Sequence, residues 1–298
     1  MEDSKLHKIA SRYLPKGKRS ILSSARYSNW LYKIEPDVGQ SLMVKVFDTE
    51  HCFVREKAAY KILNTTSVKI PNLIDVGEEG PIYWIVYDFV EGERLCDIDI
   101  RIIKDNHKLF YEIGHNLGKV HTCNPSFLFT ENEKAMYLKK RQEVFVKGAW
   151  NYKENLVKKY PGYLGIFELA AQIIKDNIIL FSDKQDFNFT KGDFSPNNTI
   201  INNESLAAII DFEYFMLENR YRDFILMYHY FEQDEQIKMS FIRGYSEGIN
   251  ACNFEFSSDK LMLVLLHYCL ECCVVANAKT IEWNIKRLTD IVEKFCRG

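Results

Sequence analysis

The chain has 298 residues, of which 47% are hydrophobic and 27% are charged, and its formal net charge is −2. These values are typical of a soluble globular protein with one large or two modest domains. Because basic residues are not in excess, the composition argues against a nucleic-acid-binding protein or a partner of anionic membranes.

The cysteines and the apolar segments indicate in which cellular compartment the protein is expected. The eight cysteines of a chain this long do not suggest a disulfide scaffold. The cysteine cluster at 267–273 is not followed by a second pair of cysteine or histidine residues at zinc-site spacing. We therefore interpret these cysteines as reduced thiols on a buried helix. The N-terminal segment has no apolar signal-peptide core, and the most apolar run, from Leu261, is too short to span a membrane. We expect a cytoplasmic protein without a membrane partner.

The first third of the chain is predicted to be rich in strands. Residues 20–36 predict two short strands around a polar turn, and residues 41–48 predict a third strand. Helical spacing of apolar residues follows over residues 52–64. Residues 70–92 then predict two strands joined by a Gly-Pro turn.

From about residue 100 the pattern becomes helical. Residues 105–122 place apolar side chains on one face. More helices are expected near 133–150, 163–181, 221–246, 257–277 and 280–296, with two short strands, 199–202 and 206–210, between them. The sequence therefore predicts an α+β protein with a small β-rich lobe, residues 1–90, and a larger, mainly helical lobe, residues 91–298.

Lys45 lies in a predicted strand, LMVKVF, that is apolar on both faces. An unpaired buried ammonium group costs several kcal/mol, so this lysine needs a partner. Glu56 on the following helix is the natural one, and Glu50 is the alternative. An edge strand whose lysine extends its ammonium group into solvent is the other explanation.

The segment TKGDFSPNNTIINNESLAAIIDFE, residues 190–213, places polar residues at the ends of apolar runs. Asp211 ends a predicted buried strand, and Asn198 immediately precedes the neighbouring one. Carboxylate and amide oxygens are ligands that Mg²⁺ prefers, which leaves Asp193 to orient a hydroxyl group and accept its proton. Taken alone, Asp211 is also explained as a turn-capping residue.

These motifs resemble a known family. The pattern GDFSPNNTII…AIIDFE is similar to the catalytic and metal-binding segments of aminoglycoside phosphotransferases, a group that includes choline kinase-like enzymes and is related in fold to protein kinases. The order of lysine strand, glutamate helix, hinge, catalytic loop and metal-binding aspartate also agrees with kinases. The resemblance covers roughly residues 20–232 and implies a protein-kinase-like bilobal fold.

The resemblance implies a role for each matching residue. Asp193 would position the acceptor hydroxyl group, while Asn198 and Asp211 would hold Mg²⁺ against the nucleotide phosphates. Lys45 would contact the phosphates, steadied by Glu56.

Further roles follow from the rest of the pattern. The backbone of the hinge would meet adenine near Asp88 and Val90, and Asp223 would support the catalytic loop. His121 matches a family position, but we interpret it as a core or helix-end histidine.

Two features depart from the family pattern. Lys191 stands where the family has a histidine that braces the catalytic loop, so we expect altered support there, and its ammonium group could lower the pKa of Asp193 or reach a phosphate. The loop between the first two strands has no glycine, so phosphate contacts would come from polar side chains instead: Ser23, Ser24, Ser28 and Asn29.

The resemblance implies a small-molecule kinase that uses ATP or GTP to phosphorylate a hydroxyl group of an aminoglycoside-like or other small polar acceptor, with antibiotic resistance as the associated role. A catalytically inactive pseudokinase or nucleotide-binding regulator is the alternative. A protein kinase is disfavoured because no Ala-Pro-Glu segment follows Asp211. Weaker candidates for acceptor contacts are Glu213, Glu218, Glu271, Tyr214 and Trp150.

Overall fold

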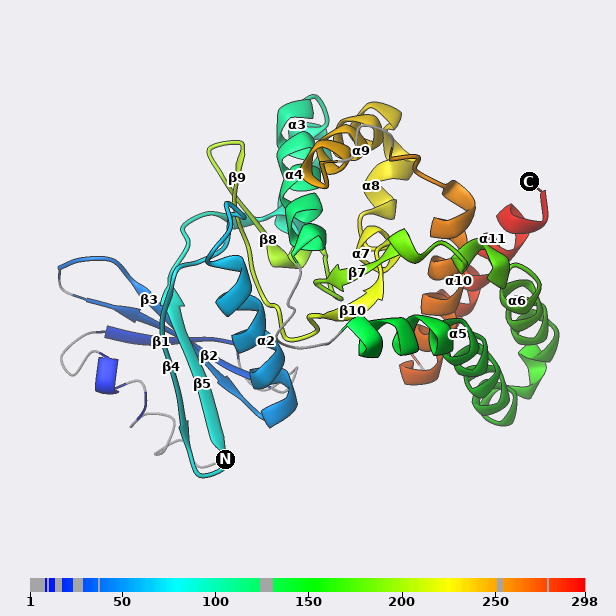
Figure 1. Ribbon diagram of the computed structural model, residues 1–298, viewed down its shortest axis with the longest axis horizontal. Coiled ribbons are helices and arrows are strands. Elements are labelled where there is room, and N and C mark those ends of the chain that lie inside the picture. The colour runs from blue at the N-terminus through cyan, green and yellow to red at the C-terminus, as the bar shows by residue number, and fades with distance from the viewer. Residues whose placement is uncertain are drawn as a thin grey trace. The chain divides into compact units, whose positions relative to one another are not determined.

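The computed structural model describes residue 9 and residues 11–13, 18–23, 29–36, 38–123, 131–250, 254–277 and 279–297. These residues form two compact units, whose helices and strands are traced in Figure 1. Unit 1 comprises the described parts of Met1–Cys123, Phe189–Met216 and Leu226–Asn253, and unit 2 those of Asn124–Asn188, Leu217–Ile225 and Phe254–Gly298. The lobes expected from the sequence, residues 1–90 and 91–298, stay a prediction.

Unit 1 contains a five-stranded antiparallel sheet in the order β1-β2-β3-β5-β4. Its strands are β1 (Lys18–Ser23), β2 (Asn29–Glu35), β3 (Leu42–Phe47), β4 (Leu73–Glu79) and β5 (Ile82–Asp88). Lys45 pairs with Leu31 of β2 and with Ile85 of β5. Since β3 is the central strand, the edge-strand explanation for Lys45 is wrong.

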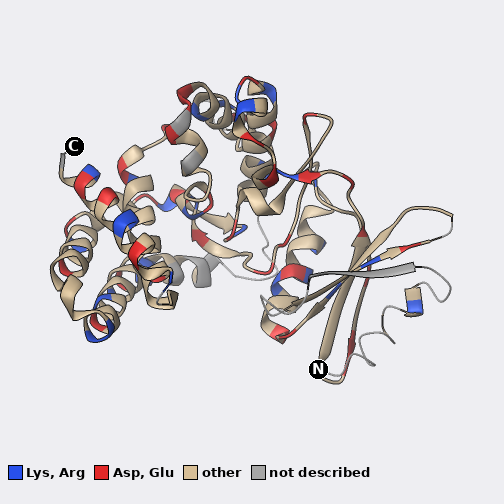
Figure 2. Ribbon diagram, turned by 180° about the vertical axis from the view of Figure 1, so that it is seen from behind, with Lys and Arg blue, Asp and Glu red and all other residues tan. Residues whose placement is uncertain are grey.

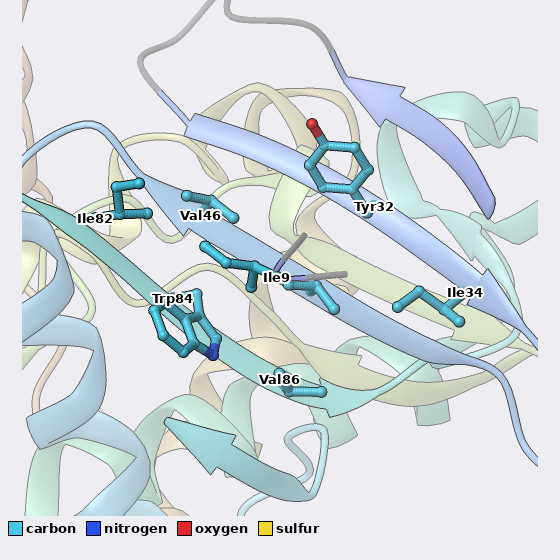
Figure 3. Close-up of a cluster of buried hydrophobic side chains, with 8 residues drawn as sticks. Ile9, Tyr32, Ile34, Val46, Ile82, Trp84 and Val86 are labelled. Atoms are coloured by element: carbon cyan, nitrogen blue, oxygen red, sulfur yellow. The ribbon is translucent and has the colours of Figure 1, made fainter. Parts of the chain in front are cut away.

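The two faces of this sheet bury different sets of side chains. One face packs Trp84 and Tyr32 with aliphatic residues of β2, β3 and β5 and with Ile9 (Figure 3). The other face packs Phe47 and Tyr87 against α2 (Glu50–Leu63). Side chains alternate along a strand, so Lys45 shares this second face with Phe47.

The remaining elements of unit 1 include a second sheet, in the order β6-β8-β9. These strands are β6 (Glu93–Arg94), β8 (Thr199–Asn202) and β9 (Ser205–Ile209), and the helices are α3 (Ile100–Ile103), α4 (His107–Thr122), α8 (Tyr228–Gln233) and α9 (Glu235–Gly248). Two further strands, β7 (Phe187–Thr190) and β10 (Met216–Asn219), pair with each other. The predicted strands near 199–202 and 206–210 are confirmed, whereas β7 and β10 were not predicted.

Helices α4 and α9 pack with their backbones in close contact. A Cβ atom at Gly114 would lie 2.1 Å from the carbonyl oxygen of Phe241, and one at Gly244 would lie 2.0 Å from that of Tyr111. Gly118 and Gly248 face each other one turn further along in the same way. Only glycine leaves room for helices this close.

Unit 2 is mainly helical. It contains α5 (Glu131–Lys159), α6 (Leu164–Asp176), α7 (Tyr221–Phe224), α10 (Ser258–Val275) and α11 (Ile281–Arg297). Single 3₁₀ turns occur in both units: η1 (Leu95–Asp97), η2 (Pro161–Tyr163), η3 (Ile178–Phe181), η4 (Lys184–Asp186) and η5 (Pro196–Asn198). Figure 2 shows basic and acidic residues interspersed along these helices. Within the described ranges, no helix has the length and apolar character needed to cross a membrane.

Three predicted helix boundaries differ from the structure. The helix expected over 221–246 is divided into α7, α8 and α9. The break before α9 falls at Asp234, which is extended and whose side chain accepts hydrogen bonds from the first amides of α9. The helix expected over 163–181 ends at Asp176 and continues as a 3₁₀ turn. The helix expected to end near residue 150 extends to Lys159, and Pro161 follows it.

Candidate active site

The ammonium group of Lys45 is surrounded by three carboxylates of unit 1. Its Nζ lies 2.7 Å from Oε2 of Glu56, 2.6 Å from Oδ1 of Asp211 and 3.2 Å from Oε2 of Glu213. The lysine is only 3% exposed and Glu56 is fully buried. The predicted Lys45–Glu56 pair is confirmed, and the alternative partner, Glu50, is exposed at the start of α2.

Burial and charge act against each other in this cluster. Burial alone would lower the pKa of Lys45, but Glu56, Asp211 and Glu213 outweigh it and raise that pKa well above its usual value. Burial raises the pKa of Glu56 to about 7, although Lys45 opposes this shift. At neutral pH the lysine therefore stays charged and contacts all three acidic side chains.

Asn198 immediately precedes β8 and Asp211 follows β9, and these two strands form one hairpin, which is labelled in Figure 1. Thr199 of β8 pairs with Ile209 of β9, and the amide of Ile210 donates a hydrogen bond of 3.0 Å to the carbonyl oxygen of Asn198. The register therefore brings the side chains that precede β8 and follow β9 to one place. Asp211 has a φ of 66°, in the left-handed region that aspartate tolerates better than most residues.

Asp193 is tied to Asn198. The Asn198 amide nitrogen donates to Oδ2 of Asp193 at 2.9 Å and to its carbonyl oxygen at 3.1 Å. The preceding Gly192 has a φ of 83°, and a Cβ atom there would lie 2.4 Å from the carbonyl oxygen of Tyr214. Glycine is required at this position both by its backbone conformation and by the lack of space for a side chain. A larger residue would therefore strain the loop that carries Asp193.

Lys191 connects the two loops. This side chain is fully buried, and its Nζ donates to the carbonyl oxygens of Asp193 and Asp211, both at 2.6 Å. Its charge, together with Lys45, lowers the pKa of Asp211 although burial acts to raise it. The lysine thus makes bracing hydrogen bonds to both loops, and the sequence pattern alone did not show which groups it would contact.

Glu213 lies inside the cluster rather than on an open surface. It is 6% exposed, and its Oε2, which faces Lys45, also accepts a hydrogen bond from the side chain of Asn29 on β2. Burial raises the pKa of Glu213, although Lys45 opposes this shift. Asn29, considered from the sequence as a phosphate contact, is therefore engaged with Glu213. The sequence feature that points to this carboxylate is its position two residues after Asp211.

The segment between β5 and β6, which the sequence analysis interprets as a hinge, has part of its backbone already engaged in hydrogen bonds. The amide of Asp88 donates to the carbonyl oxygen of Asn72 at 3.1 Å, and that of Phe89 to the carbonyl oxygen of Ser41 at 2.9 Å. Within the described ranges, the N–H of Val90 has no such partner.

The other predicted residues are dispersed. Ser24 and Ser28 lie outside the described residues. In unit 2, Glu218 forms an ion pair with Arg141, with Nε and Oε1 2.9 Å apart, and Asp223 is fully buried in α7. His121 is buried and bonds to the hydroxyl group of Tyr245 at 2.8 Å, which confirms a core histidine.

The remaining acceptor candidates differ in exposure. Glu271 pairs with Arg222 at 3.0 Å. Trp150 on α5 is partly buried, with the ammonium group of Lys153 4.4 Å above its ring. Tyr214, next to the Asp193 loop, is 47% exposed.

The donor set fits a divalent cation. Glu56, Asp211 and Glu213 each offer a carboxylate oxygen, and these three atoms lie within 4.8 Å of one another. Oε1 of Glu56 is buried and, within the described part of the chain, has no hydrogen-bond partner. The bonds of Asn198 to Asp193 are made by its side-chain nitrogen, so they do not use its amide oxygen. Hard oxygen donors of this kind suit Mg²⁺.

Comparison with known proteins places this arrangement in context. A model of the phosphotransferase enzyme family (APH) matches residues 23–254. No curated protein sequence matches the chain.

Solved structures resemble the chain along nearly its whole length. The ternary complex of streptomycin, ATP and APH(2″)-IIa is 17% identical, covers 99% of each chain and has a TM-score of 0.67. A thermostable mutant of aminoglycoside phosphotransferase APH(4)-Ia with AMP-PNP and hygromycin B is 12% identical, covers 97% of this chain and 98% of that one, and has a TM-score of 0.70. Spectinomycin phosphotransferase APH(9)-Ia with ADP and spectinomycin is 12% identical, with coverages of 100% and 94% and a TM-score of 0.61. These likenesses confirm the predicted protein-kinase-like fold.

Proposed function

Because the chain belongs to the phosphotransferase enzyme family, we propose that it is a small-molecule kinase that transfers the γ-phosphate of ATP or GTP to a hydroxyl group of a small polar acceptor. The convergence of Asp193, Asn198 and Asp211 around the Lys45 cluster carries this proposal. The solved structures of similar fold include complexes with ATP, AMP-PNP and ADP, which supports a nucleotide as the phosphate donor.

The residues divide the work of phosphoryl transfer. Asp193, oriented by Asn198, would position the acceptor hydroxyl group and take its proton as the new bond to phosphorus forms. Lys45 would exchange part of its carboxylate contacts for the nucleotide phosphates, while Glu56 keeps it in place. The N–H of Val90 and the carbonyl group of Asp88 would meet the edge of adenine. Positioning and charge neutralisation supply most of the catalysis in such reactions.

Mg²⁺ would be held by Asp211 and Asn198. When bound, it neutralises charge on the transferring phosphate and helps to orient it. The chain's own contribution is to keep both ligands at one edge of the β8–β9 hairpin through the backbone bond between Ile210 and Asn198. Lys191 holds the backbone that carries Asp211.

Exposure guides the proposal for the acceptor. Tyr214 is half-exposed and its backbone touches Gly192, beside Asp193. An aromatic ring there favours acceptors with a face that can stack, such as a sugar ring or an alkylammonium group. Because Glu218 is already neutralised by Arg141, an aminoglycoside is one candidate acceptor among several. A cytoplasmic location and a role in antibiotic resistance stay predictions.

The test combines binding with turnover. Thermal stabilisation by ATP and GTP would be measured with and without Mg²⁺, followed by phosphate transfer to a panel of aminoglycosides, choline and simple sugars. We expect a Mg²⁺-dependent shift and transfer to one acceptor class. A shift without transfer to any member would favour the pseudokinase alternative, and no shift with either nucleotide would refute the proposed site.

A separate variant tests the assignment of Asp211 as a metal ligand. Asp211→Ala should remove the Mg²⁺-dependent part of nucleotide binding, because Asp211 is the carboxylate that borders both the Lys45 cluster and Asn198. Equal ATP affinity of the unmodified chain with and without Mg²⁺ would contradict this role.

A further inference from the structure

The segment that connects α2 to β4, residues 64–72, contacts two elements of unit 1 that come much later in the chain. The carbonyl oxygen of Lys69 accepts a hydrogen bond of 2.8 Å from the amide of Ile209, the last residue of β9. The amide of Lys69 donates to Oδ1 of Asn116 on α4, also at 2.8 Å. One residue therefore joins β9 to α4, and Asp211 follows the end of β9 by two residues.

The side chain of Lys69 holds a second point of β9 together with Glu112 of α4. Its Nζ lies 3.1 Å from Oε2 of Glu112 and donates to the carbonyl oxygen of Leu206 at 2.9 Å. The same Oε2 of Glu112 accepts a hydrogen bond of 3.2 Å from the amide of Leu206. The ion pair therefore engages both backbone groups of Leu206, the second residue of β9.

The strand that is held in this way has an irregular register. Between Ile200 and Ile201 of β8 the pairing skips one residue of β9, so Ala207 has no partner opposite it. Such a bulge disrupts the ladder of hydrogen bonds locally, and a slip of β9 by one residue would move Asp211 by about 3.4 Å. Lys69 contacts β9 on both sides of Ala207, so its contacts oppose such a slip.

Helix α4 is a firm support for these contacts. It packs beside β9 (Figure 1), and its glycines bring it into close backbone contact with α9. Asn116 is only 4% exposed, and its side-chain nitrogen donates to the carbonyl oxygen of Glu112 one turn earlier, at 2.9 Å. This bond fixes the orientation of the amide whose oxygen accepts from Lys69. The clamp thus ties β9 to a buried, oriented group.

We propose that Lys69 and Glu112 are positioning residues: they fix the register of β9 on α4 and thereby the place of Asp211 beside Lys45. The inference rests on the proposed function, in which Asp211 holds Mg²⁺. The two residues act through the strand, so their loss should displace a metal ligand without removing it.

Hydrogen exchange of β9 amides tests the clamp without nucleotide or metal. Lys69→Met removes the ammonium donor but keeps an unbranched side chain, so the amides of Leu206 and Ile209 should exchange about tenfold faster. Lys69→Arg keeps the charge and should restore slow exchange. Lys108→Met is the matched control, because Lys108 also pairs with Glu112, at 3.9 Å, and among the described residues pairs with it alone. It should exchange as the unmodified chain does.

Calorimetry of ATP binding at a series of Mg²⁺ concentrations tests the positioning of Asp211. Lys69→Met should need about tenfold more Mg²⁺ for half of the Mg²⁺-dependent gain in ATP affinity, the lower end of the loss seen when groups that orient metal ligands are removed. ATP affinity without Mg²⁺ should stay unchanged. The Lys69 side chain is 42% exposed and exposed ion pairs add little stability, so the urea midpoint should also stay close to that of the unmodified chain. A merely structural role would lower that midpoint and leave the Mg²⁺ dependence unchanged.

The outcomes separate this inference from the proposed function. Unchanged exchange of β9 in Lys69→Met would overturn the clamp, and faster exchange with an unchanged Mg²⁺ dependence would overturn the positioning of Asp211. Either result leaves the kinase proposal standing, provided that the unmodified chain binds ATP more tightly with Mg²⁺. Absence of Mg²⁺-dependent ATP binding by the unmodified chain would remove the proposed function and the positioning role together.

Discussion

The buried Lys191 ammonium group offers the sharpest test of how the loops that carry Asp193 and Asp211 are held. Lys191→Met keeps the length of the side chain and removes the donors that bond the carbonyl oxygens of Asp193 and Asp211, each at 2.6 Å. A hydrogen bond from a charged group contributes about 1.5–3 kcal/mol, so losing two removes about 3–6 kcal/mol. Eliminating the desolvation of a buried charge returns part of this. We expect the free energy of unfolding to fall by about 2–4 kcal/mol.

Urea unfolding of the unmodified chain and of Lys191→Met gives this difference directly. Lys191→His serves as the comparison, because an imidazole N–H can replace one of the two donors and should recover part of the loss. Nucleotide turnover measured on the same samples should fall with Lys191→Met, since Asp193 and Asp211 are no longer tied together. If Lys191→Met has the same urea midpoint as the unmodified chain and keeps full turnover, the bracing role of Lys191 is refuted.

Three further predictions concern chemistry, packing and pH. Asp193→Asn should reduce turnover by about 100-fold or more and leave nucleotide binding nearly intact; unchanged turnover in a coupled ADP-release assay would exclude Asp193 as the base. Gly244→Ala should destabilise the chain by about 1–3 kcal/mol, because the added Cβ would lie 2.0 Å from a carbonyl oxygen of α4. Gly165→Ala in α6, where the space is open, should be neutral or stabilising by up to about 1 kcal/mol, and equal effects in urea unfolding would contradict the close packing. Burial lowers the pKa of His267 to about 3, against about 6.5 in an unfolded chain, so its contribution to stability is complete above pH 6.5 and is lost toward pH 3 by about 1.4 kcal/mol per pH unit. His267→Phe should flatten the decline of the urea midpoint between pH 6.5 and 4, whereas a substitution of the exposed His107 should not.

The sequence predicted the parts of the fold that depend on local pattern. Alternation around Lys45 predicted its strand and the face it shares with Phe47, and helical spacing predicted α2 and α4. The division of the helix expected over 221–246 was missed, because apolar spacing continues across a break that depends on the extended backbone at Asp234. Strands β7 and β10 were missed because each is short and its partner is distant in the chain, whereas β8, which is equally short, pairs with the next strand.

The candidate site was predictable where chemically suitable residues flank strands whose pairing brings them together. Asn198 and Asp211 flank adjacent strands, so pairing alone brings them together. The positions of Glu213 and Lys191 depend on irregular backbone with a positive φ at Asp211 and at Gly192. No periodic pattern encodes the direction of side chains there. Contacts between distant strands, such as that of Asn29 with Glu213, follow only once the sheet is assembled.

The glycine contact between α4 and α9 has a consequence for folding in the cell. The two helices are more than a hundred residues apart in the chain, so α4 leaves the ribosome long before α9 exists. Until then the groove formed by Gly114 and Gly118 has no cover, and the apolar face of α4 stays open to other chains. Contacts between distant segments also slow folding, because a long loop must close first. Nascent chains that end before residue 235 should therefore depend on chaperones, whereas chains that include α9 should not.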